Sequence, residues 1–373
     1  MRWEKVSQRL GDDGPGVRWG HTCNAVGDGK LLYVFGGYGR DRCQTNRVHV
    51  FDTVNMLWSE AALSGKLPTP RDSHSATTVG DKLFIFGGTD GKRPLNDLHV
   101  LDTASNSWIF PSVRGDVPEP REGHSAALIG KKLFIFGGCG KFENSETYYD
   151  DLYILDTETF SWKRVYYSGT PPSKRDSHTC SSWKNKIIVI GGEDSCNYYL
   201  SDVHVLDADT LVWCKLNTTG QLLPPRGGHT TICFNRHLFV FGGFSDEQNL
   251  YDDIYMLDIG NGAWTKLKAY GEGPSGRFSV AGECLDPHMK GVLVFIGGCN
   301  KSLEALDDMY FLHTGRQNFY LNEYHTPMGK KTFQAKVTQS FADGYSIETV
   351  IDGKPLRGLI FSSRPVSVNM EAN

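Results

Sequence analysis

Short apolar runs recur at nearly even intervals along this chain of 373 residues. Each run ends in a pair of glycines, as in Leu83-Phe84-Ile85-Phe86-Gly87-Gly88. Successive pairs begin 51, 50, 54, 51 and 55 residues apart, at Gly36, Gly87, Gly137, Gly191, Gly242 and Gly297. Such regular spacing predicts one supersecondary unit that is used six times.

The unit at residues 71–111 shows the expected strands most clearly. Its second apolar run has no polar position, so we expect neighbouring units to cover both faces of that strand. Turn-forming residues separate the runs, which predicts an antiparallel meander. The four strands are predicted at Ser75–Val79, Leu83–Phe86, Asp97–Leu101 and from Ser107 onward.

Two further landmarks accompany the glycine pairs. A tryptophan follows each of the first five pairs, whereas the sixth pair has none and Trp3 stands alone near the N-terminus. We therefore predict that the strand around Trp3 completes the sixth unit, since a closed ring leaves no sheet edge exposed. An arginine precedes every pair by 16 to 20 residues, at Arg18, Arg71, Arg121, Arg175, Arg226 and Arg277.

Together these motifs resemble the kelch repeat, which combines Pro-x-x-Arg, His-Ser, Gly-Gly, Asp-Leu-x-x-Leu-Asp and Trp at a period near 50. The resemblance covers residues 1–315. It implies an all-β, six-bladed β-propeller of four-stranded antiparallel blades. Within the family, the chain is similar to intracellular kelch-repeat proteins of plants and to the kelch region of host cell factor-like proteins.

Residues 316–373 lack the repeat and form a second predicted segment. Two turn signals, Asp343-Gly344 and Asp352-Gly353, separate three short runs of β-like sequence. This pattern predicts a small β-hairpin or meander packed on the propeller. A partly flexible extension is the alternative.

Composition narrows the classes of partner. The net charge is -4, so the chain lacks the excess of basic residues that nucleic-acid binding requires. We predict no nucleic-acid or membrane partner, because no apolar run reaches membrane-spanning length. Nine cysteines without a Cys-x-x-Cys motif and the absence of an apolar leader predict a reducing cytoplasmic or nuclear location. Without coiled-coil heptads, a monomer or weak oligomer is expected.

Strand direction predicts a functional face. In a four-stranded meander, the loops after the glycine pairs and the arginines lie on one side of the ring, which we call the loop face. Loops held by a rigid scaffold commonly bind partners. Aromatic side chains beside arginine and lysine are typical of protein-binding surfaces. The predicted partner-binding residues are a basic sector of Arg40, Arg42, Arg47, Lys92 and Arg93, and an acidic and aromatic sector that contains Phe142, Tyr148, Tyr149, Tyr198, Tyr199 and Phe244.

The six arginines are expected near the central channel. The structural interpretation pairs each with a backbone carbonyl or a carboxylate such as Asp72 or Asp176. The alternative is an anion-binding crown that grips a carboxylate of a partner.

No catalytic, metal or cofactor site is predicted. Five repeated histidines would lie around a ring rather than converge on one point, as metal ligands must. The iron-dependent specifier proteins of plants offer an alternative function, but Glu193-Asp194 with Asp202 and His204 does not keep their ligand spacing. The expected function is therefore that of a non-enzymatic scaffold or adaptor that binds a protein or peptide.

Overall fold

The computed structural model describes residues 1–7, 13–39, 42–142, 145–246, 249–315, 336–341, 344–351 and 354–361. It divides into two compact units, Met1–Arg316 and Gln317–Asn373. Their described residues form β-strands and connecting loops, without an α-helix. In this part of the chain no helix is therefore long and apolar enough to cross a bilayer.

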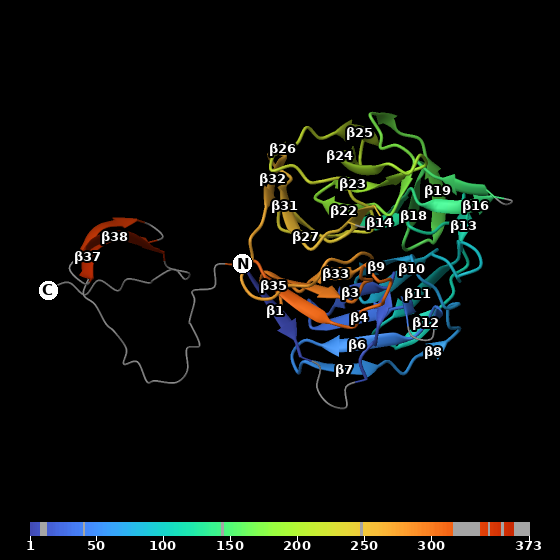
Figure 1. Cartoon of the computed structure of the whole chain (residues 1–373), viewed down its shortest axis with the longest axis horizontal. Helices are drawn as coiled ribbons and strands as arrows, with labels where there is room; N and C mark the ends of the chain where they lie inside the picture. Colours follow the sequence, from blue (N-terminus) through green and yellow to red (C-terminus); the bar gives the residue numbers. More distant parts are fainter. Residues whose placement is uncertain are drawn as a thin grey trace. The chain divides into compact units, whose positions relative to one another are not determined.

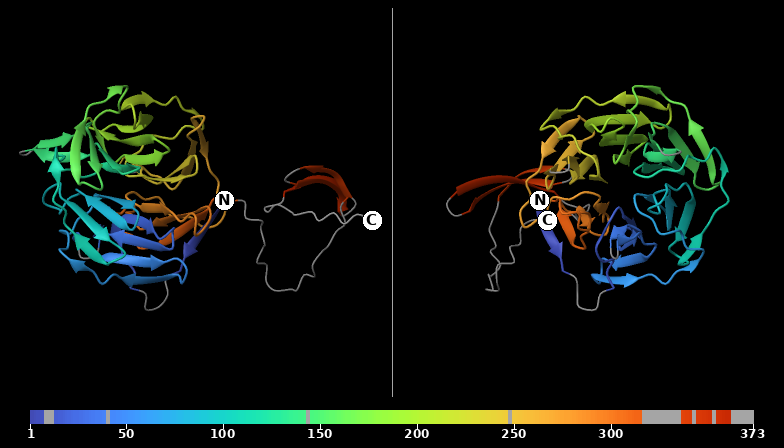
Figure 2. Two further views of the ribbon diagram at one scale, coloured as in Figure 1. Left: turned by 180° about the vertical axis from the view of Figure 1, so that it is seen from behind. Right: turned by 45° about the vertical axis from the view of Figure 1, so that its right-hand side comes forward.

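The first unit is a closed ring of six blades (Figures 1 and 2). Blade 1 consists of β3 (Thr22–Val26), β4 (Leu31–Phe35), β6 (Val48–Asp52) and β7 (Leu57–Glu60). Blade 2 consists of β9 (Ser75–Val79), β10 (Lys82–Phe86), β11 (Leu98–Asp102) and β12 (Ser107–Ile109). Blade 3 consists of β14 (Ser125–Ile129), β15 (Lys132–Phe136), β18 (Leu152–Asp156) and β19 (Ser161–Val165).

The remaining blades repeat the same order. Blade 4 consists of β22 (Thr179–Trp183), β23 (Lys186–Asp194), β24 (Tyr199–Asp207) and β25 (Val212–Lys215). Blade 5 consists of β27 (Thr230–Phe234), β28 (His237–Phe241), β31 (Ile254–Asp258) and β32 (Ala263–Lys266). Blade 6 consists of β33 (Ala281–Cys284), β34 (Val292–Ile296), β35 (Met309–His313) and the N-terminal β1 (Arg2–Val6). The predicted six-bladed propeller is confirmed.

The N-terminal strand closes the ring as predicted. β1 pairs antiparallel with β35, and Trp3 lies opposite Leu312 (Figure 1). The Trp3 ring contacts Phe241 of blade 5 and Phe295 of blade 6, at centroid distances of 5.7 and 5.3 Å. Two ends of the chain that are about 300 residues apart thus share one hydrophobic core.

Four blades carry a fifth strand that the sequence pattern does not predict. A two-residue segment from the preceding linker lies parallel to the tryptophan-bearing strand, for example β8 (Ser64–Gly65) beside β12. A Cβ on Gly65 would lie 2.4 Å from the carbonyl oxygen of Trp108, so this close approach requires glycine. A strand of two residues is too short to show the alternation of apolar and polar positions from which strands are predicted. The other three are β13 (Arg114–Gly115), β20 (Ser168–Gly169) and β26 (Thr219–Gly220).

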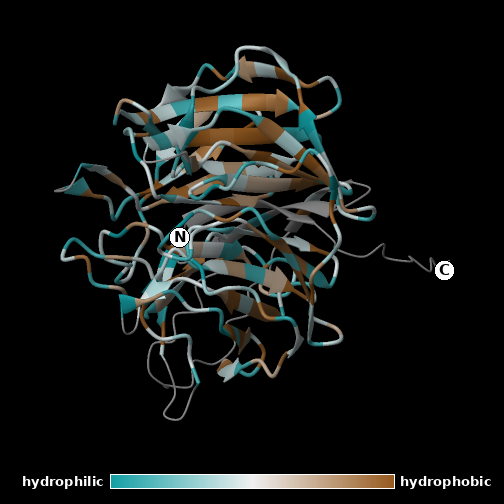
Figure 3. Ribbon diagram, turned by 90° about the vertical axis from the view of Figure 1, so that its right-hand side faces the viewer, coloured by the Kyte–Doolittle hydropathy of each residue, from teal (hydrophilic) through white to brown (hydrophobic). Residues whose placement is uncertain are grey.

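Many strand residues of the propeller are hydrophobic (Figure 3). Apolar side chains of the second strands are buried in clusters that span neighbouring blades. Phe86 of β10 is fully buried and lies 5.0 Å from the Trp162 ring of blade 3. Trp108 of blade 2 packs in the same way on Phe35 of blade 1, at 5.2 Å. The tryptophans therefore join each blade to the one before it, which gives the loop face a rigid base.

The second unit contains a three-stranded antiparallel sheet in the order β36-β37-β38. In sequence, Asp343-Gly344 lies at the start of β37 and Asp352-Gly353 lies between β37 and β38. The packing of this sheet on the propeller stays a prediction. Its strands are β36 (Lys336–Phe341), β37 (Gly344–Ile351) and β38 (Lys354–Phe361).

Candidate functional site

Six residues, one from each blade, form a closed circle of backbone hydrogen bonds around the central channel. Each donates its N–H to the carbonyl oxygen of the equivalent residue in the preceding blade, over 2.8 to 3.3 Å. All six have a positive φ of 50 to 66°. The circle holds the channel opening on the loop face in a fixed geometry. We call it the channel ring; its members are Gly20, Ser73, Gly123, Ser177, Gly228 and Ser279.

The residue before each member of the channel ring lies at the opening, and we call these six the rim. Each rim residue pairs with the residue that directly follows a glycine pair, as Asp176 does with Glu193. Three consecutive blades contribute acids to the rim, and two others contribute large aromatic side chains. The opening therefore has an acidic half and an aromatic half. The rim residues are Trp19, Asp72, Glu122, Asp176, Gly227 and Phe278.

Two carboxyl groups of the acidic half change charge near neutral pH. Burial, with smaller contributions from Asp72 and Asp176, raises the pKa of Glu122 to about 7. Burial and the neighbouring Glu193 raise the pKa of Asp176 to about 7 as well. The Cys139 thiol donates to Oδ2 of Asp176 over 3.5 Å, while Oδ1 is buried without a partner among the described residues. Carboxyl groups perturbed in this way at an opening are typical of functional sites.

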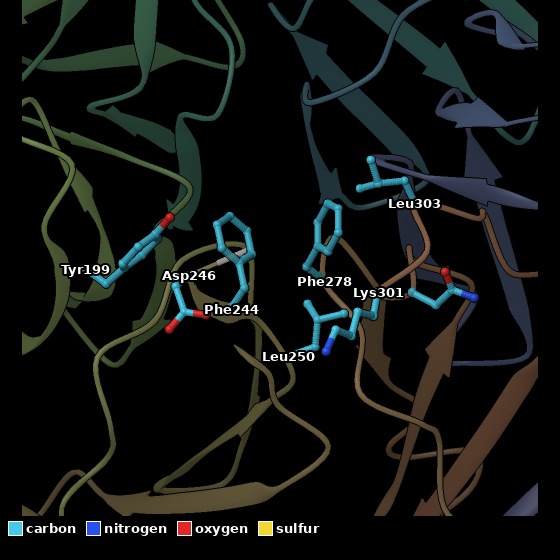
Figure 4. A pocket seen from close by; sticks show the side chains of 8 residues that line it. Tyr199, Phe244, Asp246, Leu250, Phe278, Lys301 and Leu303 are labelled. Carbon is cyan, nitrogen blue, oxygen red and sulfur yellow. The ribbon is translucent and has the colours of Figure 1, made fainter. Parts of the chain in front are cut away.

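The aromatic half forms a row of side chains that ends in a pocket. The Trp19 and Phe278 rings lie 6.0 Å apart, those of Phe278 and Phe244 lie 5.2 Å apart, and those of Phe244 and Tyr199 lie 5.4 Å apart. Figure 4 shows this row from Tyr199 to Phe278, with Leu303 and Lys301 beyond it. The pocket encloses about 530 Å³ and is lined by Tyr199, Phe244, Asp246, Leu250, Phe278, Asn300, Lys301 and Leu303.

The predicted aromatic residues occupy different environments. Tyr199 and Phe244 line the pocket, whereas Tyr198 projects from its loop with 69% of its surface exposed. Tyr148 lines a separate hollow with Glu146 and Lys174. Tyr149 is half-buried, with its ring 4.3 Å from the Arg121 guanidinium. Phe142 belongs to β16 (Cys139–Phe142), but its side chain lies outside the described part of the structure.

The predicted basic sector lies on exposed loops. Arg42, Arg47, Lys92 and Arg93 are exposed, and Arg40 lies outside the described residues. Two of these charges have acidic neighbours: Arg47 lies 3.6 Å from Glu60, and Arg93 lies 3.9 Å from Asp90. Exposed pairs of this kind are weak, so these side chains stay accessible to a partner.

Each of the six arginines near the channel has a structural contact within its own blade. All are buried, and each donates from Nη1 to the carbonyl oxygen of the first glycine in its own blade, over 2.9 to 3.0 Å. The expectation of Asp72 and Asp176 as partners is wrong, because those acids lie on the rim. In blades 2 to 6 the partner is an aspartate on the third strand or directly before it, namely Asp97, Asp151, Asp202, Asp253 and Asp308.

The acids weighed as metal ligands have other contacts. Asp202 pairs with Arg175 at 2.7 Å and accepts a hydrogen bond from His204 at 3.0 Å. Among the described residues, no group of three His, Cys, Asp or Glu side chains could hold a metal ion.

Sequence reasoning missed most of the rim. Trp19, Glu122 and Phe278 were not among the predicted partner-binding residues. A signal was present, because one position directly after each arginine changes from acid to aromatic around the ring. Its meaning became apparent only when the channel ring placed these residues together.

Comparisons with known proteins agree with the architecture. The chain matches the KLHDC2/KLHL20/DRC7 Kelch-repeats domain over residues 1–192 and 123–340. It is 32% identical over 272 residues to Kelch domain-containing protein 3 of Rattus norvegicus, covering 70% of this chain and 57% of that protein. It is 30% identical over 326 residues to Acyl-CoA-binding domain-containing protein 4 of Arabidopsis thaliana, covering 86% of this chain and 38% of that protein.

A third relative is the Host cell factor of Drosophila melanogaster, which is 31% identical over 297 residues. The match covers 74% of this chain and 16% of that protein. The chain thus spans less than two thirds of each of these three relatives.

Proposed function

The chain belongs to the kelch-repeat family of β-propellers, and from this premise we propose that it is a non-enzymatic module that docks a partner protein at its loop face. Kelch propellers commonly act as protein-interaction modules, and this fold supplies a rigid base for the loops. The observation that carries the proposal is the divided rim, with carboxyl groups on one side of the opening and aromatic rings on the other.

The divided rim favours a peptide segment with two kinds of side chain. Its aromatic or aliphatic side chain would enter the pocket beside Phe244 and Phe278, where about 530 Å³ is available. Its lysine or arginine would face Glu122 and Asp176. The basic sector would attract acidic residues that flank this segment and so increase the rate of association.

The proposed location is the cytoplasm or nucleus, in keeping with nine cysteines that form no disulfide in the described part of the chain. The scaffold or adaptor role likewise remains part of the proposal. A docking module that presents its loop face needs no second copy of the chain, so we propose a monomer or weak oligomer.

Selection from a phage-displayed library of random peptides tests the docking proposal. We expect the immobilised protein to enrich peptides that combine a cationic and an apolar side chain. Two variants, Glu122→Gln with Asp176→Asn and, separately, Phe244→Ala, should each weaken binding of a selected peptide about tenfold or more in calorimetric titration, because each removes one half of the recognition.

A matched control changes acids on the opposite face of the propeller. Asp81→Asn with Glu158→Gln removes the same number of charges from exposed turns and should leave the affinity unchanged. The proposal fails if no peptide is enriched, if enriched peptides lack cationic side chains, or if the control variant weakens binding as much as the rim variants do.

Binding of a cationic peptide is also expected to depend on pH. The pKa values of Glu122 and Asp176 are both about 7, so the two carboxyl groups gain negative charge between pH 6 and pH 8. The affinity measured by titration should therefore rise over this interval. The Glu122→Gln, Asp176→Asn variant should show a flat profile, and an equally steep profile in that variant would contradict the assignment.

The same groups affect stability in the opposite direction. Their pKa values are raised on folding, so between pH 4.5 and about 7 the folded protein holds protons that the unfolded chain has lost. Their stabilising contribution is present at low pH and is lost as the pH rises through 7. The free energy of unfolding of the double variant, relative to the unmodified protein, should accordingly increase from pH 5 to pH 8.

A further inference from the structure

Blade 1 departs from the other five blades in the partner of its buried arginine. In blades 2 to 6 an aspartate on the third strand or directly before it pairs with the arginine, as Asp97 does with Arg71 at 2.8 Å. In blade 1 the equivalent position before β6 holds Arg47. A cation thus stands where five sister blades place a carboxylate.

Arg18 is consequently buried without a carboxylate partner among the described residues. Only 5% of its surface is exposed. Nη1 donates to the carbonyl oxygen of Gly36 over 2.9 Å, and Nη2 donates to the carbonyl oxygen of Pro15. Its Nε is buried and has no hydrogen-bond partner in the part of the chain that the structure describes. Burial of a guanidinium without a counter-charge is costly, so this group is prepared for an external anion.

A pocket of about 340 Å³ lies at this arginine. Two cationic side chains, Arg18 and Arg47, line it together with His49. Burial, Arg18 and Arg47, in that order, lower the pKa of His49 to about 4. The remaining lining residues are Gly14, Pro15, Gly16, Val17, Gly39, Cys43, Gln44 and Thr45.

We propose that blade 1 contains a carboxylate-binding site in which Arg18 and Arg47 hold a ligand's carboxylate in the place that an aspartate fills in the other blades. The other five blades indicate which ligand would fit, because the equivalent arginine binds a carboxylate in each of them. It donates to both carboxylate oxygens in blades 2, 3, 4 and 6 and to one in blade 5. The site is separate from the rim and does not depend on docking there.

Three acidic residues of the chain itself, Glu60, Asp12 and Asp41, have to be distinguished from an external ligand as sources of a carboxylate. Glu60 lies 3.6 Å from Arg47 and carries an exposed side chain. It lies opposite His49 across the β6–β7 pair. Asp12 and Asp41 are close in sequence to the pocket and lie outside the described residues. The test therefore includes a variant that removes both of these aspartates.

Calorimetric titration with malonate tests for the site, and a second arm uses the acetylated and amidated peptide Gly-Asp-Gly. We expect malonate to bind at a stoichiometry of one and to raise the NMR-determined pKa of the His49 ring, since the added negative charge opposes Arg18 and Arg47. Glu60 and the Cys43 thiol are the other titratable groups near this ring. Binding by the peptide but not its Gly-Asn-Gly analogue would identify a protein side chain as a source; binding by malonate alone would identify a small molecule.

Arg47→Asp is the decisive variant because it restores the residue that the other blades carry. It should remain folded, with an unchanged or higher melting temperature, and lose malonate binding by about tenfold or more. Arg164→Gln, which changes an exposed arginine on β19 of blade 3, should bind as the unmodified protein does. The variant Asp12→Asn with Asp41→Asn should also bind normally.

Three results would overturn the site. One is the absence of a malonate response and of a His49 shift in the unmodified protein. Another is binding that survives Arg47→Asp in a folded variant. The third is a response that emerges only after Asp12→Asn with Asp41→Asn, since the chain would then supply its own carboxylate.

Discussion

Replacing Trp3 with alanine is expected to destabilise the propeller by about 3–5 kcal/mol, the usual cost of emptying a tryptophan site in a core. Trp3 is 8% exposed and packs against aromatic rings of blades 5 and 6. Its backbone N–H also donates to the carbonyl oxygen of Tyr270 over 2.8 Å. Loss of this side chain removes the aromatic contacts by which β1 joins blades 5 and 6.

Chemical denaturation monitored by circular dichroism measures this effect as a fall in the midpoint concentration of urea. Arg2→Ala, the adjacent residue on β1, is the matched control. The Arg2 side chain is 46% exposed, pairs with exposed Glu4 and lies 3.4 Å from Nε2 of His313, so the loss of these surface contacts should cost less than about 1 kcal/mol. Equal midpoints for the two variants would show that closure through β1 does not stabilise the ring.

Replacing Asp151 with alanine is expected to cost about 3–5 kcal/mol, because it leaves a buried charge without its partner. The Arg121 guanidinium is fully buried and pairs with Asp151 at 2.6 Å. The other hydrogen bonds of Arg121 go to neutral carbonyl oxygens, of which Gly137 is 2.9 Å away. Those groups cannot neutralise the charge, so blade 3 should be weakened strongly.

An exposed ion pair of the same blade provides the comparison. Lys131 and Glu158 lie 2.5 Å apart, and both side chains are more than half exposed. Glu158→Ala should therefore change the free energy of unfolding by no more than about 1 kcal/mol. A third variant, Arg121→Met with Asp151→Leu, removes both charges and should recover much of the loss. Similar midpoints for Asp151→Ala and Glu158→Ala would refute the importance of the buried pair.

The buried pair of blade 2, Arg71 with Asp97, also makes the stability depend on pH. Burial alone would raise the pKa of Asp97, but hydrogen bonds from His99 and Arg71 outweigh it and hold the pKa below its usual range. A depressed pKa stabilises the fold at neutral pH, and that contribution is lost only in strong acid. The rim acids and Asp97 therefore change the stability in opposite directions as the pH changes, so a titration of stability separates their contributions.

Much of the fold followed from short-range patterns. The period of the glycine pairs predicted the number of blades, and the unpaired Trp3 predicted closure, because both are regularities of the linear chain. The second strand of blade 2 was predicted at Leu83–Phe86 and is observed at Lys82–Phe86. The two-residue edge strands were missed because their only signal is a glycine that approaches a tryptophan distant in sequence.

The partner of each arginine could not be found in this way. Asp72 is adjacent to Arg71 in sequence, yet adjacent residues of an extended segment point in opposite directions. Arg71 therefore reaches Asp97, 26 residues further on, while Asp72 accepts hydrogen bonds from Gln44 and Ser73 at the rim. Arg47 could therefore be recognised as an exception, an arginine at the position of the pairing aspartate, only once this pairing was known.

The sequence by itself determined the blade number, the strand order and the closure of the ring, because these depend on the period and polarity of residues near one another in the chain. Tertiary structure alone decided which side chains meet at the channel opening and which arginine lacks an acid. Those relations join residues of different blades or of distant strands, and the channel ring and the packing between blades, rather than local preference, fix where they lie.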